Sequence, residues 1–252
     1  MSASLDGRSV IVTGAGRNVG EAISRELVGR GARVAVVDLD QESADRVAKV
    51  LNGERPGSAV SLAADVSSPD DVQRMVNAAW DALGSVDTLI NCVAITDRPT
   101  NVLDLSDDRW DQVLRVSLSS AFFTSKYVGR RMVDSGTHGV IIHIGSTSGF
   151  FARRNAIAYP TAKAGLYALV RSLALQLGGY GIRVNTVSPN KVGSPVGQAE
   201  EPPDRERKNL IGRACTPQDI ASAVAFMVSE EASFVTGTDL LVDGGALIAS
   251  GD

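Results

Sequence analysis

The sequence has 252 residues, of which 44% are hydrophobic, enough to bury the core of one large α/β domain or two small ones. A net charge of −4 without a basic block argues against a nucleic-acid partner, and two distant cysteines with two histidines argue against a disulfide framework, a metal site or a serine–histidine triad. No signal segment or apolar run of membrane-spanning length is present, so we expect a soluble cytoplasmic protein without a membrane partner.

Along the chain, short β-branched runs alternate with longer amphipathic segments. Strands are predicted at residues 9–12, 33–37, 59–62, 88–91, 140–144, 183–187 and 240–242. Helices are predicted near residues 19–29, 41–51, 69–83, 106–134, 159–177 and 217–229. Asp40, Ser68 and Thr216 precede three of these helices as N-terminal caps. Continuous apolar strands separated by helices indicate a doubly wound α/β fold, with about seven parallel strands and helices on both faces of the sheet.

No linker-like or low-complexity segment divides the chain, so we predict a single domain over residues 1–252. The irregular stretch near residues 193–210 is polar, charged and poorly periodic. We interpret it as an inserted substrate loop within that domain.

A glycine-bearing turn follows the first predicted strand. Gly14, Gly16 and Gly20 would let backbone N–H groups approach a pyrophosphate at the helix N-terminus, where the helix dipole favours an anion. The second strand ends in Asp38, about 20 residues on, where a carboxylate can hold a ribose diol. That carboxylate repels a 2′-phosphate and favours NAD over NADP, whereas Arg17 beside the turn would attract the phosphate. We give Asp38 more weight because no basic residue directly follows it, although it can also be a simple turn residue.

Tyr159 and Lys163 are four residues apart in a predicted helix, so their side chains share one face. Pro160 is tolerated only in a first helical turn, which predicts a helix start just before Tyr159. The helix dipole and the Lys163 ammonium would both lower the pKa of the phenol, favouring proton exchange with an alcohol or carbonyl oxygen. Ser146, on the turn after a strand, offers a hydroxyl to the same oxygen. The alternatives are an ordinary surface pair and a turn-forming or capping serine.

These features together resemble the short-chain dehydrogenase/reductase family over nearly the whole chain. Residues 13–20 resemble its cofactor turn, Asp65 and Val66 its adenine-contacting pair, and residues 91–94 its NNAG motif. Ser146, Tyr159 and Lys163 match its catalytic residues in spacing, and residues 183–189 and 236–245 are also typical. The resemblance implies a Rossmann fold and an NAD-dependent oxidoreductase that acts on a secondary alcohol or ketone.

The resemblance also implies a role for each site residue. Tyr159 would be the general acid/base, Lys163 would lower its pKa and hold the nicotinamide ribose, and Ser146 would position the substrate oxygen. The implied cofactor-binding residues are Gly14, Arg17, Asn18, Val19, Gly20, Asp38, Leu39, Asp65, Val66, Asn91, Ala94, Tyr159, Lys163, Pro189, Val192 and Ser194. The family commonly forms homotetramers, and the apolar helices predicted at 106–134 and 159–177 suit burial against another subunit, so we expect a homotetramer or a homodimer.

Several positions depart from the family pattern. Asn18 replaces the middle glycine of the cofactor turn, and asparagine tolerates left-handed dihedrals. Ala94 adds a methyl group near the expected ribose, Asn190 replaces a glycine, and Ser194 replaces a threonine. Ser117, included among the catalytic candidates, replaces an asparagine that helps to hold a water in a proton relay to the lysine. Because serine is shorter, the relay would be slower or need an extra water.

The substrate is less defined. Arg153 and Arg154, between Ser146 and Tyr159, would suit a carboxylate or phosphate, or else be solvated or contact another subunit. A hypothesis from another class is a non-catalytic NAD-binding sensor or scaffold, which Ser117 and the altered motifs suggest. A dehydratase or epimerase is less expected, because those relatives usually carry a longer C-terminal substrate domain.

Overall fold

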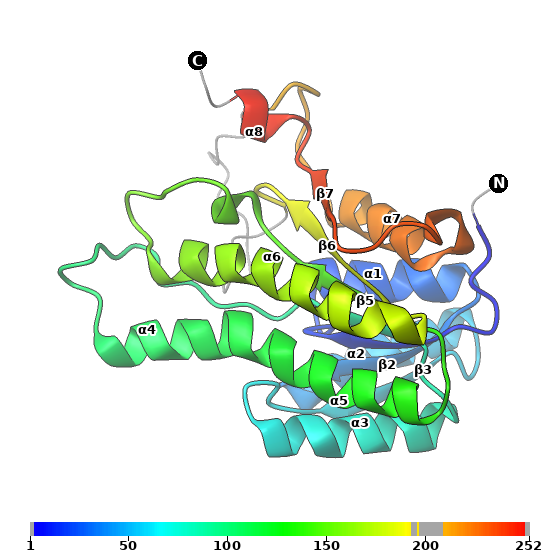
Figure 1. Cartoon of the computed structure of the whole chain (residues 1–252). Helices are drawn as coiled ribbons and strands as arrows, with labels where there is room; N and C mark the ends of the chain where they lie inside the picture. The colour runs from blue at the N-terminus through cyan, green and yellow to red at the C-terminus, as the bar shows by residue number, and fades with distance from the viewer. Residues whose placement is uncertain (1–2, 193–195, 197–208, 250–252) are drawn as a thin grey trace.

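The computed structural model describes residues 3–192, 196 and 209–249. Seven strands form one sheet in the order β3-β2-β1-β4-β5-β6-β7, and every neighbouring pair is parallel (Figure 1). The strands are β1 (Ser9–Thr13), β2 (Arg33–Asp38), β3 (Ala59–Ala63), β4 (Thr88–Asn91), β5 (Val140–Ile144), β6 (Arg183–Pro189) and β7 (Asp239–Val242). The predicted strands are confirmed, with small differences at their ends.

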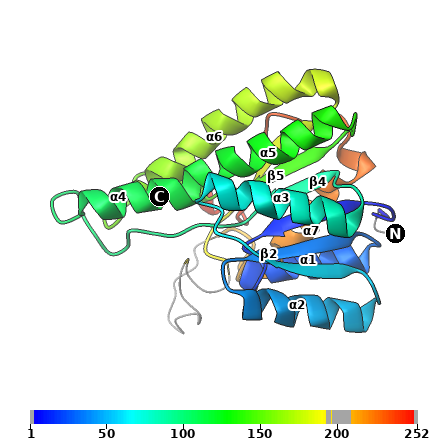
Figure 2. The ribbon, with the colours of Figure 1, turned by 90° about the horizontal axis from the view of Figure 1, so that it is seen from below.

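Helices cover both faces of the sheet. They are α1 (Asn18–Gly29), α2 (Gln41–Glu54), α3 (Pro69–Leu83), α4 (Asp107–Leu114), α5 (Ser120–Asp134), α6 (Ala158–Leu177), α7 (Pro217–Val228) and the short α8 (Ala246–Ala249). Figure 2 shows α3, α5 and α6 on one side of the sheet and α1, α2 and α7 on the other. The doubly wound fold is therefore confirmed. Among the described residues, no helix is long and apolar enough to cross a bilayer.

The core forms on both sides of each central strand. Val10 and Val12 pack in the cluster that contains α1, α2 and α7, whereas Ile11 packs with α3, α5 and α6. All three are fully buried, as the alternation of side chains along a strand requires when both faces are covered. Burial of each such side chain contributes roughly 1.5–3 kcal/mol.

The strand order creates a crevice where the connections diverge. The chain proceeds from β1 to β2 and β3 on one side, and from β4 to β7 on the other, so the segments leaving β1 and β4 separate at the carboxyl edge of the sheet. Gly14 follows β1 and lies against the segment after β4: a Cβ at Gly14 would be 3.1 Å from the Val93 side chain. The fold thus places the glycine turn at the mouth of this crevice.

The helix predicted over 106–134 is confirmed, with one local departure. A π-helical turn, Arg115–Ser119, joins α4 to α5, and the backbone stays in the right-handed helical region at both junctions. Hydroxyl groups compete for the backbone at this position: Ser120 Oγ donates to the Val116 carbonyl at 2.7 Å, and Ser117 Oγ is bonded to the Ile95 backbone. An amphipathic pattern does not reveal such local competition.

The predicted helix starts are confirmed. Asp40, Ser68 and Thr216 each accept a hydrogen bond from a backbone N–H in the first turn of the following helix. At α7 the bond is reciprocal, because the Asp219 carboxylate accepts from the Thr216 N–H at 2.8 Å. Helix α6 begins one residue before Tyr159, where the following proline predicts it.

Candidate active site

A cleft of about 760 Å³ follows the carboxyl edge of the sheet. Most of the expected cofactor residues line it: Gly14, Arg17, Asn18, Val19, Gly20, Asp38, Leu39, Asp65, Val66, Ala94, Pro189 and Val192. Ser146, Arg153, Tyr159 and Lys163 line the same cleft. After the roles expected from the sequence, we call the part formed by residues 14–20, 38–39 and 65–66 the dinucleotide end, and the part formed by these four residues the catalytic end. Ser194 lies outside the described residues.

The glycine turn is tightly folded. Gly14 has φ +65°, and Asn18 has φ +52°, so asparagine adopts the left-handed conformation expected of it. A Cβ at Gly20 would lie 2.1 Å from the Gly14 carbonyl oxygen, which only glycine avoids. Arg46 of α2 braces the turn from outside, donating to the Gly16 carbonyl at 2.7 Å and pairing with Glu21. The sequence did not predict this role of Arg46, because its partners Gly16 and Glu21 lie at least 25 positions earlier in the chain.

Asp38 is tied to the same turn. One carboxylate oxygen accepts from the Gly16 N–H at 2.8 Å, and the other accepts from the Asp40 N–H at 3.2 Å. Because each carboxylate oxygen has two lone-pair sites, Asp38 retains acceptor capacity toward the cleft. Leu39 beside it is exposed and Arg17 is an exposed cation on the same rim, so an apolar, an anionic and a cationic group all meet here.

Asp65 and Val66 form the far wall of the dinucleotide end. The Asp65 carboxylate accepts hydrogen bonds from the Ser67 N–H at 2.9 Å and from the Ser67 hydroxyl at 2.7 Å. These bonds shape the turn after β3 and leave buried Val66 in the wall.

The fold brings Ser146, Tyr159 and Lys163 together, with exposed fractions of 9%, 9% and 3%. The Lys163 ammonium lies 5.8 Å from the centroid of the Tyr159 ring and donates to the Ile144 carbonyl at 2.8 Å. Ser146 Oγ accepts from the Ser148 N–H at 3.1 Å and is hydrogen-bonded to Tyr159. The three polar groups therefore share one water-poor corner of the cleft.

The expected lowering of the phenol pKa is wrong for this state of the protein. Burial raises the pKa of Tyr159, and this outweighs the hydrogen bond from Ser146 and the positive charges of Arg153 and Arg98, which lower it. Burial also lowers the pKa of Lys163 to about 8. The sequence shows the helix position of Tyr159, but it does not show how much water the fold removes from around the phenol.

A second tyrosine supports Ser146. The Tyr167 hydroxyl donates to the Ser146 carbonyl at 2.6 Å and accepts from the Ser146 N–H at 3.3 Å. It also hydrogen-bonds Ser188 Oγ at 3.1 Å, joining the ends of β5 and β6. Tyr167 lies eight residues after Tyr159 on α6, a spacing that places both on one helix face. That spacing is a usable sequence signal which our reasoning did not use.

Two expected site residues act behind the cleft wall, so their roles are revised. The Asn91 amide group contacts His143 Nδ1 at 3.1 Å, and its oxygen accepts from the Thr124 hydroxyl at 2.8 Å. The Ser117 hydroxyl accepts from the Ile95 N–H and donates to the Ile95 carbonyl, both at 3.0 Å. Neither side chain lines the cleft. Asn91 links β4 to β5 and α5, and Ser117 fixes the segment that follows β4.

The two arginines expected to contact substrate lie differently. Arg153 lines the catalytic end, donates to Ser148 Oγ at 3.0 Å, and places its guanidinium carbon 4.3 Å from the Phe151 ring centroid. Arg154 is exposed and does not line the cleft, so its assignment to the substrate site is corrected. Arg98, from the segment after β4, lines the catalytic end instead.

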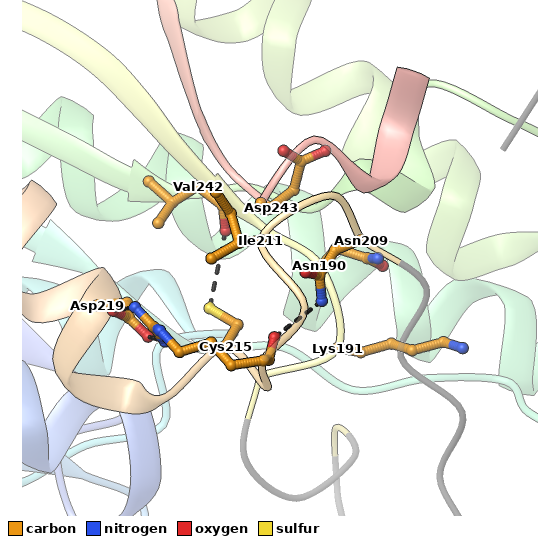
Figure 3. Close-up of a pocket in the computed structure, with 10 residues that line it drawn as sticks. Asn190, Lys191, Asn209, Ile211, Cys215, Asp219, Val242 and Asp243 are labelled. Carbon is orange, nitrogen blue, oxygen red and sulfur yellow. Dashed lines mark hydrogen bonds and ion pairs between the residues drawn. The ribbon is translucent and has the colours of Figure 1, made fainter. Parts of the chain in front are cut away.

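A smaller hollow of about 230 Å³ lies beside the carboxyl end of β7 (Figure 3). Its polar groups bind one another: Asn209 donates to the Arg213 carbonyl at 2.8 Å, and Arg213 pairs with Asp219 at 2.6 Å. The Cys215 thiol lies 3.8 Å from the Val242 carbonyl. These contacts anchor residues 209–215 to the end of the sheet, and we assign them a structural role.

The chain is similar to known oxidoreductases along its length. A family model described as enoyl-(acyl carrier protein) reductase matches residues 14–246. A D-threitol dehydrogenase from Mycolicibacterium smegmatis is 36% identical over 249 residues, covering 97% of this chain and 94% of the relative. A meso-2,3-butanediol dehydrogenase from Serratia marcescens is 34% identical over 249 residues, covering 98% and 97%. A crystal structure of 3-ketoacyl-(acyl-carrier-protein) reductase from Brucella melitensis, complexed with NADH, matches with TM-score 0.90 and 30% identity over 97% of this chain and 100% of that chain.

Proposed function

This chain belongs to the short-chain dehydrogenase/reductase family of oxidoreductases, and on that premise we propose that it transfers a hydride between NAD(H) and a secondary alcohol or ketone. The observation that carries the proposal is the meeting of Ser146, Tyr159 and Lys163 in the cleft that also contains the glycine turn. A binding-only protein has no need for a buried phenol, hydroxyl and amine at one point.

The dinucleotide end fits the proposed cofactor. Its cleft has the volume of a typical cofactor site, and the absence of side chains at Gly14 and Gly20 leaves backbone N–H groups open to a pyrophosphate at the start of α1. Asp38 would hold the adenosine ribose, Lys163 the nicotinamide ribose, and Val192 the carboxamide side. When bound, the nicotinamide supplies or accepts the hydride.

The chain's own residues would manage the proton and the substrate oxygen. Ser146 holds the oxygen through its hydroxyl and stabilises charge that develops there. Tyr159 accepts the proton in alcohol oxidation and donates it in ketone reduction. Below its pKa of about 8, Lys163 is an ammonium, and this charge stabilises the phenolate at the moment it forms. Because the pKa of Tyr159 is raised, oxidation should accelerate as pH rises.

Arg153 is the proposed substrate contact beyond the reacting oxygen. It lines the catalytic end next to Ser148, and a guanidinium suits a polar or anionic substituent. Two relatives are named for the alcohols D-threitol and meso-2,3-butanediol, which supports an alcohol substrate here. Ser117 would act indirectly, by holding Ile95 in the wall of the cleft.

We also propose a homotetramer. Phe122 on α5 and Leu175 on α6 are exposed, Leu175 at 85%, on two helices of the same face of the sheet. A second subunit packed against these helices would remove this apolar surface from water. Light scattering coupled to size exclusion gives the mass in solution, and a monomeric mass would contradict the proposal.

The proposed activity is tested with NAD and a panel of secondary alcohols that includes D-threitol and meso-2,3-butanediol. We expect NADH to accumulate with at least one alcohol, and Tyr159→Phe to abolish most of that turnover while still binding NADH. Binding of NADH without turnover of any alcohol or ketone would favour a sensor or scaffold.

A further inference from the structure

The helix that carries Tyr159 begins without a local cap. The first N–H groups of a helix have no partner within it, and the N-cap residue of α6 is Ile157, whose side chain cannot accept a hydrogen bond. Pro160 has no N–H. The donors to be satisfied in this first turn are therefore those of half-buried Ile157 and of buried Ala158 and Tyr159.

One distant carboxylate satisfies all three donors. Asp97 accepts from the Ile157 N–H at 2.6 Å, the Ala158 N–H at 2.9 Å and the Tyr159 N–H at 3.1 Å. Its exposed fraction is 2%. Burial raises the pKa of Asp97, but these backbone hydrogen bonds outweigh burial and lower it, so the group is a carboxylate at neutral pH. The capping of α6 is complete and depends on this one side chain.

Asp97 belongs to the segment that leaves β4 and forms part of the cleft wall. Ala94 and Ile95 line the cleft, Ser117 bonds both backbone groups of Ile95, and Arg109 donates to the Thr96 carbonyl. Successive residues of this short segment are thus bound to the π-helical turn, to α4 and to α6. In contrast, α3 and α7 are capped by the residues that directly precede them.

We propose that Asp97 is a positioning residue that fixes Tyr159 relative to the cofactor wall of the cleft. This inference rests on the proposed function. The carboxylate holds the backbone of Tyr159 itself, and it connects that backbone to residues 94–95 across 62 positions of sequence. Near-attack geometry tolerates little error, since a misplacement of about 1 Å can cost roughly 100-fold in rate. Asp97 also places a negative charge at the positive end of α6.

The test compares Asp97→Ala with Asp97→Asn. We expect kcat with a substrate found in the alcohol panel to fall roughly 10- to 100-fold in Asp97→Ala, with NADH affinity largely unchanged. Asp97→Asn retains one carbonyl acceptor for the helix and should recover part of the rate. A matched control is Thr216→Ala, which removes the cap of α7 on the opposite face of the sheet; it should lower the melting temperature without lowering kcat.

A second readout does not need turnover. The absorbance titration of the wild type minus that of Tyr159→Phe isolates the Tyr159 phenol, which faces Ser146, Lys163, Arg153, Arg98 and Cys92. Loss of the Asp97 charge, and any loosening of the buried helix start, both lower the pKa of this phenol. We therefore expect a lower midpoint in both Asp97 variants.

The outcomes separate this inference from the proposed function. A folded Asp97→Ala protein with wild-type kcat would overturn the inference, as would a kcat loss no larger than that of Thr216→Ala. If the wild type turns over no alcohol or ketone, the proposed function fails, and the midpoint of the Tyr159 titration becomes the only test of the inference. A lower midpoint in the Asp97 variants supports the link from Asp97 to Tyr159. An unchanged midpoint overturns it.

Discussion

At the dinucleotide end of the cleft, the wall is largely one continuous turn, residues 14–20, with Asp38 bonded to it from the next strand. At the catalytic end, Ser146, Tyr159 and Lys163 come from two elements and are held in place by partners distant in sequence, such as Asp97 and Tyr167. The first end is built around one local turn, with residues 38–39 and 65–66 added from the next two strands, whereas the second exists only when β4, β5 and α6 are packed together. We therefore expect changes at the two ends to separate into binding effects and rate effects.

The largest effect should come from Tyr159→Phe, which removes the proposed proton-transfer group and leaves the dinucleotide end intact. General acid/base catalysis contributes roughly 10²- to 10⁴-fold, so kcat should fall by about that factor while NADH affinity changes little. Steady-state kinetics and calorimetry on the same preparation provide the check. A variant that loses NADH binding along with turnover would show that the two ends are not separable.

The packing beneath the catalytic end makes a prediction about pH and stability. Burial, together with the charge of Lys163, lowers the pKa of His143 to about 3, whereas the unfolded chain has the ordinary value. Below about pH 6.5 the unfolded state gains a proton that the folded state does not, so stability falls as the pH decreases, by about 2 kcal/mol at pH 5.

His143→Gln removes this titration and retains a side chain that can bond Asn91 and Ser125. Urea unfolding at several pH values should show that the free energy of unfolding of this variant decreases less between neutral pH and pH 5 than that of the wild type. Equal slopes in the two proteins would contradict a neutral, buried His143.

Asp38→Asn sharpens the comparison at the dinucleotide end. The amide oxygen can still accept from the Gly16 N–H, but the negative charge that repels a 2′-phosphate is lost. The ratio of NADPH to NADH affinity should rise by at least about tenfold, or 1.4 kcal/mol, with kcat for the NAD reaction much less affected. An unchanged ratio would assign the choice of cofactor to another group, with Arg17 the first to test.

The smallest effect should come from the cap of α7, away from both ends of the cleft. Thr216→Ala should lower the free energy of unfolding by about 1 kcal/mol, because Thr216 accepts from the Asp219 N–H at the helix start. Thermal unfolding measures this change, and Thr216→Ser should restore most of it. A Thr216→Ala protein as stable as the wild type would show that the cap contributes little.

The features that could be predicted from the sequence are those formed by residues close together in the chain. The strands, most helices and the glycine turn are read from runs of adjacent residues, and the left-handed Asn18 is a local property of asparagine. The spacing of Tyr159 and Lys163, with the proline between them, was enough to predict the start of α6. In each case the physical cause lies within a few residues of the feature.

What could not be predicted depends on contacts between distant segments. Nothing near Asp97 shows that it caps a helix that starts 61 positions later. The sequence places Ser117 among the catalytic candidates, whereas in the structure its hydroxyl accepts a hydrogen bond from the Ile95 N–H. The neighbouring Arg153 and Arg154 are indistinguishable in sequence, yet the loop turns only Arg153 into the cleft. The raised pKa of Tyr159 likewise comes from burial, a property of the assembled fold.

Cofactor binding is tested most directly by a calorimetric titration of the purified protein with NADH and, separately, with NADPH. We expect one NADH per chain, bound at least about tenfold more tightly than NADPH, because Asp38 lies on the rim of the dinucleotide end. Tighter binding of NADPH would show that Arg17 outweighs Asp38. Binding of neither dinucleotide would contradict the proposal that this cleft holds a nicotinamide cofactor beside Tyr159.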